Sequence, residues 1–449
     1  MASAAEQLAA NLNFGAIAKA TELKKRIWFT LGALIVYRLG TYIPLPGIDP
    51  VVLNQIFSQN SQGILGMFNM FSGGALQRMT IFALNIMPYI SASIIVQLMT
   101  SISPSFAALK KEGEAGRKKL NQYTRYGTVL LTALQAYGLA VGLEHMSAGG
   151  MSAAIDPGFF FRATTVITLI GGTMFLMWLG EQITSRGVGN GISLIIFAGI
   201  IAELPRALAG TFQLSVAQNW NVFAIPALLL FVAGVIYVIV YMERAQRRIL
   251  IQYPKRQVGM KITQGESSHL PLKLNTAGVI PPIFASSLLL MPMTLASFSA
   301  QGGGPEWLTT MTSMLGHGQP LYIVFYVLGI VFFSFFYTAV VFNPEDTADN
   351  LKKYGGFIPG IRPGKNTAEY LDFVLTRLTV LGAIYLSVLC LLPEILISEF
   401  AVPFYFGGTS LLIVVNVTMD TVGQIHSHLM AHQYEGLIKK AKLKGGRGK

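Results

Sequence analysis

The sequence predicts an all-α integral membrane protein with ten transmembrane helices, and three observations support this fold class. Of the 449 residues, 52% are hydrophobic and only 12% are charged, with a mean hydropathy of +0.53. Soluble domains carry about 25% charged residues. Long apolar segments recur along the chain, and basic residues gather in alternate connections between them. We therefore expect a bundle of helices in a lipid bilayer.

Ten windows are apolar and long enough for a helix to cross a bilayer. They lie at 27–43, 76–99, 123–143, 161–181, 188–203, 222–242, 277–298, 320–342, 376–397 and 407–427. The fifth window is the weakest, because it is short and Glu203 stands at its end. An even number of spans places both ends of the chain on one side of the membrane.

The distribution of basic residues identifies that side as the cytoplasm. With both ends inside, 29 of the 33 Lys and Arg residues fall in cytoplasmic segments or, like Arg125 and Arg377, at the cytoplasmic ends of spans, as the positive-inside rule requires. The four exceptions are Arg38, Arg78, Arg162 and Arg206. The N-terminal segment lacks the apolar core and cleavage site of a signal peptide, so we expect the first span to be retained.

The stretch 63–99 combines a segment too short to span with one that is long enough. Residues 64–71 are apolar and are followed by Ser72, Gly73 and Gly74. Eight helical residues reach about 12 Å, whereas the hydrocarbon core is about 30 Å thick. The following residues, 75–99, are long enough for a spanning helix. A break in the helical backbone at membrane depth is tolerated only where protein covers it or where it lines a water-filled cavity. This stretch therefore predicts a pathway through the molecule.

Two large connections, 243–275 and 343–371, are predicted to be cytoplasmic. In the first, alternation in 248–253 and 258–263 predicts a β-ribbon or hairpin. In the second, residues 360–364 predict a turn that presents Arg362. The basic residues of the first connection have two interpretations. They set the membrane topology or contact anionic lipid, or they dock to RNA phosphates or an acidic protein. These residues are Arg244, Arg247, Arg248, Lys255, Arg256 and Lys261.

Catalytic and metal-binding patterns are not evident in the sequence. The histidines at 426, 428 and 432 have no Cys or carboxylate pair to complete a tetrahedral site, so we interpret them as interfacial. An ion-coupled transporter would place acids at mid-membrane, but the candidates lie toward span ends: Glu181, Glu203, Glu394 and Asp420. The single cysteine, Cys390, excludes an internal disulfide. We expect neither an enzyme, a metal site nor a cofactor.

Many motifs resemble the SecY family of bacterial protein-conducting channels. They include FNMFSGGAL, IMPYISASIIVQL, GTMFLMWLGEQIT, GVGNGISLIIFAGI, SSHLPLKLNTAGVIPPIFASS and FNPEDTADNLKKYGGFIPGIRPG, in the order of the family. The resemblance omits only the N-terminal residues, the external loops and the tail. Three positions depart from the family pattern: Asn85 replaces a usual Gly, Met291 replaces a bulkier aromatic, and Met260 stands where relatives often have a basic residue.

The resemblance implies two pseudo-symmetric five-helix halves, 1–221 and 222–449, around a central pore. A pore ring would consist of Ile86, Ile90, Ile196, Ile283 and Ile413, although spacing alone makes Ile86 and Ile90 ordinary packing residues. A re-entrant plug helix would consist of Ile64, Leu65, Gly66, Met67, Phe68, Asn69, Met70 and Phe71, with a hinge at Gly73 and Gly74. A lateral gate would lie near Ser91 and Met291. Docking residues would be Lys255, Arg256, Arg362, Pro363 and Gly364.

The implied function is passage of unfolded preproteins across the bacterial inner (plasma) membrane, with lateral release of transmembrane segments into lipid. The implied partners are the small membrane subunits SecE and SecG, the SecA ATPase motor, the ribosome through its rRNA and proteins, signal peptides and nascent chains, and membrane lipids. Two alternatives stay open: an inverted-repeat secondary transporter of a small solute, and a membrane scaffold that only recruits ribosomes.

Overall fold

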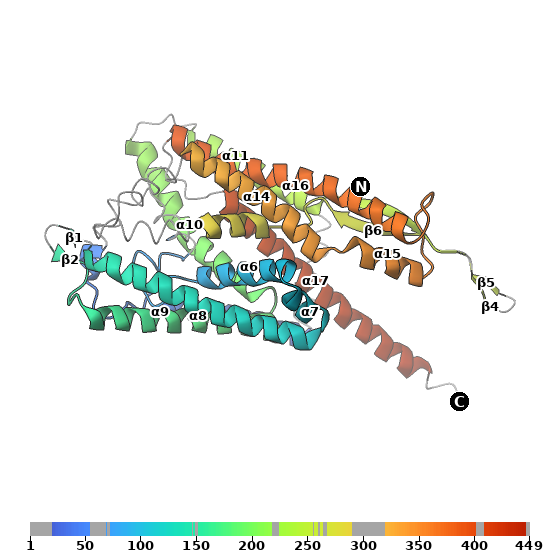
Figure 1. Cartoon of the computed structure of the whole chain (residues 1–449), viewed down its shortest axis with the longest axis horizontal. Helices are drawn as coiled ribbons and strands as arrows, with labels where there is room; N and C mark the ends of the chain where they lie inside the picture. Colours follow the sequence, from blue (N-terminus) through green and yellow to red (C-terminus); the bar gives the residue numbers. More distant parts are fainter. Residues whose placement is uncertain are drawn as a thin grey trace.

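The protein is a bundle of long helices, shown by a computed structural model in Figure 1. The structure describes residues 20–53, 69, 72–145, 147–148, 151–217, 224–254, 256–258, 261–263, 267–289, 319–400 and 408–445. Helices α8 and α9 lie side by side, as do α14 and α16, and α17 packs against α10, α11 and α16.

The helices lie along most of the chain. Those before residue 221 are α3 (Thr21–Gly40), α6 (Met87–Ile102), α7 (Pro104–Lys111), α8 (Glu114–His145), α9 (Phe159–Arg186) and α10 (Gly191–Ala217). Those after it are α11 (Ala224–Arg244), α14 (Pro320–Val341), α15 (Pro344–Lys353), α16 (Lys365–Phe400) and α17 (Gly408–Gly445). A shorter apolar helix covers Ile280–Leu289.

Within the described ranges, six helices are long and apolar enough to cross a membrane, or seven if α6 and α7, bent by 99°, form one span. The prediction of an all-α, multi-span membrane protein is therefore confirmed. The count of ten spans stays a prediction, because the seventh window, 277–298, is described only to residue 289.

The predicted second span is wrong in its first half. Residues 72–86 form turns, and α6 begins only at Met87. Met79 and Asn85 have positive φ of 45° and 50°, which interrupts a helix. The backbone N–H of Leu45 donates to the Met79 carbonyl at 2.9 Å, and that of Ile81 donates to the Ile43 carbonyl at 3.1 Å. These bonds tie the segment to the connection after α3 instead of to its own helix.

The predicted end of the fifth span is also wrong, because α10 continues through Glu203 to Ala217. The side chains of Glu203 and Arg78 both lie against Gly74. A carboxylate beside a guanidinium costs less to place along a membrane helix than an isolated one. The local hydropathy that suggested a stop at Glu203 therefore missed a nearby basic side chain from another segment.

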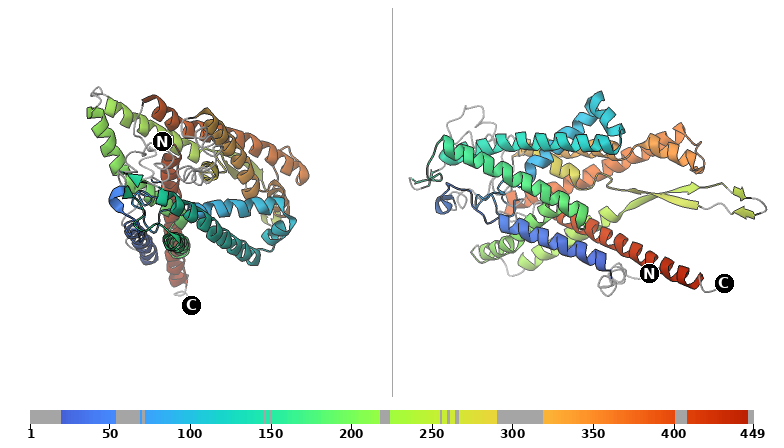
Figure 2. Two further views of the ribbon diagram at one scale, coloured as in Figure 1. Left: turned by 60° about the vertical axis from the view of Figure 1, so that its left-hand side comes forward. Right: turned by 90° about the horizontal axis from the view of Figure 1, so that it is seen from below.

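The predicted ribbon in the 243–275 connection is confirmed, with more strands than expected. Strand β3 (Gln246–Gln252) pairs antiparallel with β6 (Ser267–Lys273), and β4 (Arg256–Val258) pairs with β5 (Lys261–Thr263). The ribbon and the C-terminal part of α17 extend beyond the same end of the bundle (Figure 2). At the opposite end, β1 (Ser147–Ala148) and β2 (Met151–Ser152) form a small hairpin between α8 and α9.

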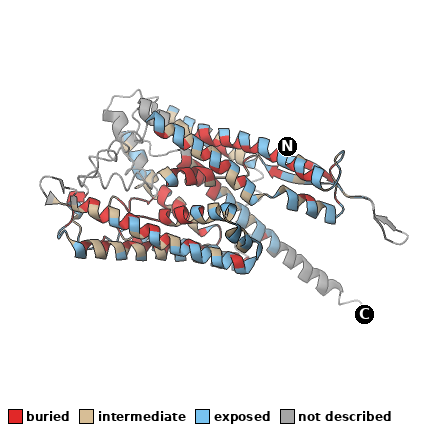
Figure 3. Ribbon diagram, in the orientation of Figure 1, coloured by how far each residue is buried: buried red, intermediate tan, exposed pale blue. Residues whose placement is uncertain are grey.

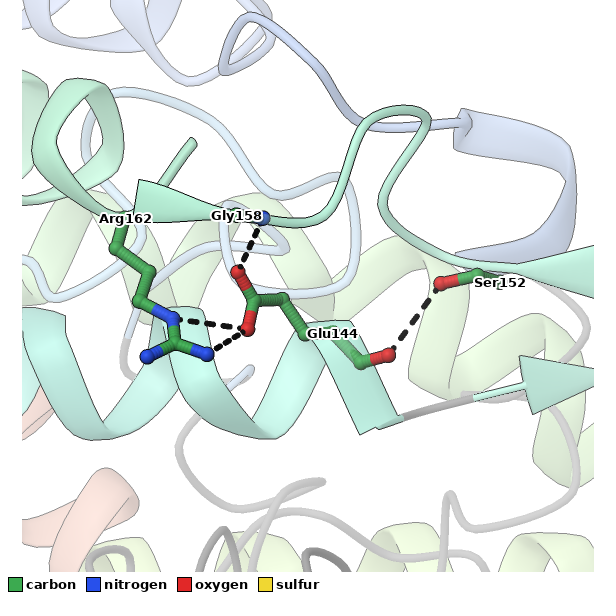
Figure 4. Close-up of polar contacts among 4 residues, drawn as sticks. All are labelled: Glu144, Ser152, Gly158 and Arg162. Carbon is green, nitrogen blue, oxygen red and sulfur yellow. Dashed lines mark hydrogen bonds and ion pairs between the residues drawn. The ribbon is translucent and has the colours of Figure 1, made fainter. Parts of the chain in front are cut away.

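That opposite end is held by an ion pair between α8 and α9 (Figure 4). One carboxylate oxygen of Glu144 accepts from Arg162 Nε at 2.9 Å and from Nη2 at 2.5 Å. The other accepts from the backbone N–H of Gly158 at 2.9 Å, and Ser152 Oγ donates to the Glu144 carbonyl at 3.4 Å. The side chain of Glu144 is only 5% exposed. Arg162 thus has a local structural partner on the side predicted to be external.

Candidate functional site

The five predicted ring isoleucines belong to one apolar cluster at the centre of the bundle. Ile86, Ile90, Ile196 and Ile413 are buried, and Ile283 is partly buried against the same cluster. They come from the turn before α6, from α6, α10 and α17, and from the helix Ile280–Leu289. Figure 3 shows the buried residues concentrated in this central region. The cluster also contains ordinary core residues, so membership does not assign a role.

The predicted hinge has a backbone that favours glycine. Gly73 and Gly74 have φ of 64° and 80°, a region in which side chains are strained. A Cβ on Gly73 would lie 3.0 Å from Gly199 Cα in α10. Close approach of α10 and left-handed geometry therefore both disfavour a side chain at Gly73.

Two arginines bind the hinge, and the sequence did not predict this. The carbonyl oxygen of Gly73 accepts from Arg38 Nη1 at 2.7 Å and from Arg78 Nη2 at 3.0 Å. Both guanidinium groups lie over the ring of Tyr42, at 5.0 and 4.2 Å from its centroid. We call Arg38, Arg78 and Gly73 the hinge clamp. The available signal was that neither arginine fitted the positive-inside distribution.

The plug residues 64–68, 70 and 71 lie outside the described residues, and Asn69 is the only described one. The side chain of Asn69 accepts from the backbone N–H of Gln77 at 2.8 Å, and its carbonyl accepts from that of Gly74 at 2.8 Å. Arg206 Nη1 donates to Gln77 Oε1 at 3.2 Å. All four arginines that departed from the charge rule thus have protein partners in the structure.

At the predicted gate, Ser91 in α6 is buried, whereas Met291 lies outside the described residues. The structure shows a different contact between these two segments: Ser287 Oγ donates to Met87 Sδ at 3.7 Å. Met87 begins α6, and Ser287 lies one helical turn after Ile283. Sequence reasoning missed this pair, because neither residue is distinctive in its local pattern.

The 243–275 and 343–371 connections form one unit. Gln252 at the end of β3 exchanges backbone hydrogen bonds with Phe357, at 2.9 and 3.0 Å. A second apolar cluster joins the strands, this connection and the start of α16; its buried members are Ile249, Leu272, Ile358, Leu371, Val374, Leu375 and Leu378. The ribbon is therefore anchored to the connection that carries Arg362.

The predicted docking residues are only partly visible. Arg362 and Pro363 are exposed in the turn before α16, where Gly364 has a φ of 110°. Arg256 lies in β4, with its side-chain surroundings outside the described part, and Lys255 is not described. In the described ranges, no group of three or more His, Cys, Asp and Glu side chains is arranged to hold a metal ion.

Comparison with known proteins agrees with this architecture. The family model described as SecY matches residues 80–422. The protein translocase subunit SecY of Rickettsia conorii is 57% identical over 423 residues, covering 94% of this chain and 97% of that protein. Two solved structures share the fold. A SecY channel, described through its plug domain and closed state, has a TM-score of 0.64 at 18% identity, covering 90% of this chain and 92% of the other. Sec61 in a canine ribosome–channel complex has a TM-score of 0.61 at 17% identity, with the same coverage.

Proposed function

The chain belongs to the SecY family of protein translocase subunits, and on this premise we propose how its residues conduct a polypeptide across a membrane. It is a multi-pass membrane protein and a subunit of a protein-conducting channel. The alternative of a small-solute transporter has no support in these relatives. We infer that the chain has no catalytic role of its own, so the driving force comes from translation, from a SecA-type motor or from the membrane potential.

We propose that the five isoleucines form the constriction of the pore. The observation that carries this proposal is their convergence, from four separate segments, on one buried apolar cluster. A ring of branched aliphatic side chains expels water and so resists ions. It offers a passing chain no polar partner to which it could bind. The same side chains can then close around an extended polypeptide as a seal.

The plug proposal places residues 64–71 on the external side of the ring. Its support is the hinge clamp, which fixes the backbone directly after the plug segment. In the resting channel the clamp would hold the plug segment near the ring. Displacement by a passing chain would require rotation about Gly73 and Gly74, whose backbone tolerates many conformations.

The lateral gate is proposed between α6 and the helix Ile280–Leu289, where Ser287 contacts Met87. The thioether sulfur of methionine is a weak hydrogen-bond acceptor, so breaking this contact would cost little free energy. An apolar segment of about 20 residues is more stable in lipid than in a watery pore. Separation of the two helices would therefore let such a segment partition sideways.

The docking proposal assigns the ribbon and the 343–371 connection to cytoplasmic partners. Support comes from their anchoring as one unit, from the exposure of Arg362, and from the ribosome in the canine complex that shares the fold. We propose the ribosome and a SecA-type motor as partners there, SecE and SecG as membrane partners, signal peptides and preproteins as substrates, and surrounding lipid. We place both termini in the cytoplasm and the protein in the bacterial inner membrane.

Cross-linking of a stalled secretory chain tests the pore. Photoreactive residues would replace Ile90 and Ile283, with Leu230 on the exposed face of α11 as the matched control. We expect the stalled chain to cross-link at both isoleucine positions and not at the control. A stalled chain that reaches neither isoleucine position would refute the pore assignment and favour a scaffold that only recruits ribosomes.

A further inference from the structure

A buried polar junction joins three segments of the chain after residue 221. The carboxylate of Glu243, at the end of α11, accepts from Asn275 Nδ2 at 2.7 Å. The side chain of Asn416 in α17 lies beside the Glu243 carboxylate. Asn275 and Asn416 are only 4% and 7% exposed. We call Glu243, Asn275 and Asn416 the carboxylate junction; nothing in the pore, plug, gate or docking assignments uses it.

Asn275 also organises the start of the next helix. Its Oδ1 accepts from the backbone N–H of Gly278 at 3.1 Å, and its Nδ2 donates to the Gly278 carbonyl at 3.1 Å. Gly278 has a φ of 64°, and the helix Ile280–Leu289 begins two residues later. The Asn275 side chain therefore fixes the turn from which the helix carrying Ile283 departs.

Asn416 lies three residues after Ile413 in α17, which is about 4.5 Å along the helix axis. Residues three apart share a helix face, and both side chains are buried. Holding Asn416 therefore holds the face of α17 that carries Ile413. The junction thus connects the supports of two ring isoleucines, one from each of two helices.

Glu243 lies on the face of α11 that packs against the rest of the bundle. It lies one turn after Ile239, which is fully buried, so the two residues mark the face of α11 that packs on α17. Most other large side chains of α11 are exposed; they include Leu229, Leu230, Phe231, Tyr237, Val238 and Tyr241. A partly buried carboxylate that accepts from one amide and lies beside a second contributes both energy and direction, because its oxygens cannot be left unpaired without a desolvation cost.

We propose that Glu243 is a positioning residue for the pore ring, holding Ile283 through Asn275 and Ile413 through Asn416. This inference rests on the proposed ring. Loss of the carboxylate would free the two helices to shift against each other, and the resting seal would loosen. Hydrogen bonds to a charged group are strong enough for a change of about tenfold in the closed-to-open equilibrium.

The test compares the resting ion conductance of the full-length channel complex, reconstituted without preprotein, among five variants. Glu243→Ala removes both acceptors, and we expect conductance to rise about tenfold. Glu243→Gln keeps a carbonyl acceptor, so we expect conductance near that of the unchanged chain. Asn416→Val breaks only the α17 arm and should give an intermediate rise. Asp420→Asn is the matched control, because it removes an exposed charge near Glu243 without removing these hydrogen bonds.

Ile413→Ser separates this inference from the proposed function. If Ile413→Ser raises conductance but Glu243→Ala and Asn416→Val do not, the ring stands and the positioning role is overturned. If Ile413→Ser has no effect either, the ring itself is overturned. A merely structural role would lower the unfolding midpoint of Glu243→Ala and Glu243→Gln alike without separating their conductances. An equal rise in Asp420→Asn would attribute the effect to charge and would also overturn the proposal.

Discussion

Loss of the hinge clamp should release the backbone at Gly73 and Gly74. The perturbation is Arg38→Gln combined with Arg78→Gln, which removes two charged donors, at 2.7 and 3.0 Å, from one carbonyl oxygen. Hydrogen bonds to charged groups contribute about 1.5–3 kcal/mol. Both arginines are only half-buried, so solvent screening reduces this to about 1 kcal/mol each. The pair then contributes about 2 kcal/mol, or about 30-fold in local opening.

Hydrogen exchange of the backbone amides at 74–77 measures this opening directly. In the structure the Gly74 N–H donates to the Asn69 carbonyl, and the Gln77 N–H donates to the Asn69 side chain. We expect these amides to exchange about 30-fold faster in the double variant. Each single variant should give a smaller effect.

Arg162→Gln is the matched control, since it removes another arginine that departed from the charge rule but pairs with Glu144, away from the hinge. It should leave exchange at 74–77 unchanged. Exchange in the double variant at the rate of the unchanged chain would refute the clamp. The arginines would then be passive neighbours of the Gly73 carbonyl.

Three further outcomes follow from the structure. Deletion of residues 64–71 should raise resting ion conductance, because the ring alone seals incompletely; an unchanged conductance would remove the plug assignment. Arg362→Glu should impair motor-driven transport while the complex stays assembled in the membrane, because it reverses an exposed charge; normal SecA-dependent transport would remove Arg362 from the docking site. Glu144→Ala should lower the thermal unfolding midpoint in detergent, because it leaves Arg162 and the Gly158 N–H without this carboxylate; an equal midpoint would show that water replaces it at no cost.

The sequence by itself determined the membrane class, the approximate helices and the β-ribbon of the 243–275 connection. These features depend on quantities that add up along the chain: hydropathy over a window of about 20 residues, charge within a connection, and alternation within a strand. Thus the window 161–181 falls within α9, the window 320–342 ends one residue after α14, and the pattern at 248–253 falls largely within β3. Family motifs added the isoleucines, which the structure gathers into one cluster.

Only the tertiary structure decided which polar and charged groups from distant segments pair with one another. The turns at 72–86 depend on bonds to Leu45 and Ile43, and α10 continues past Glu203 with Arg78 nearby. The hydrogen-bond partners of Arg38, Arg162, Arg206 and Glu243 lie on other segments as well. Arg78 lies over the ring of Tyr42, which belongs to the connection after α3. A buried charge or backbone carbonyl is stable only with a partner, and such partners are brought together by folding, not by proximity in the chain.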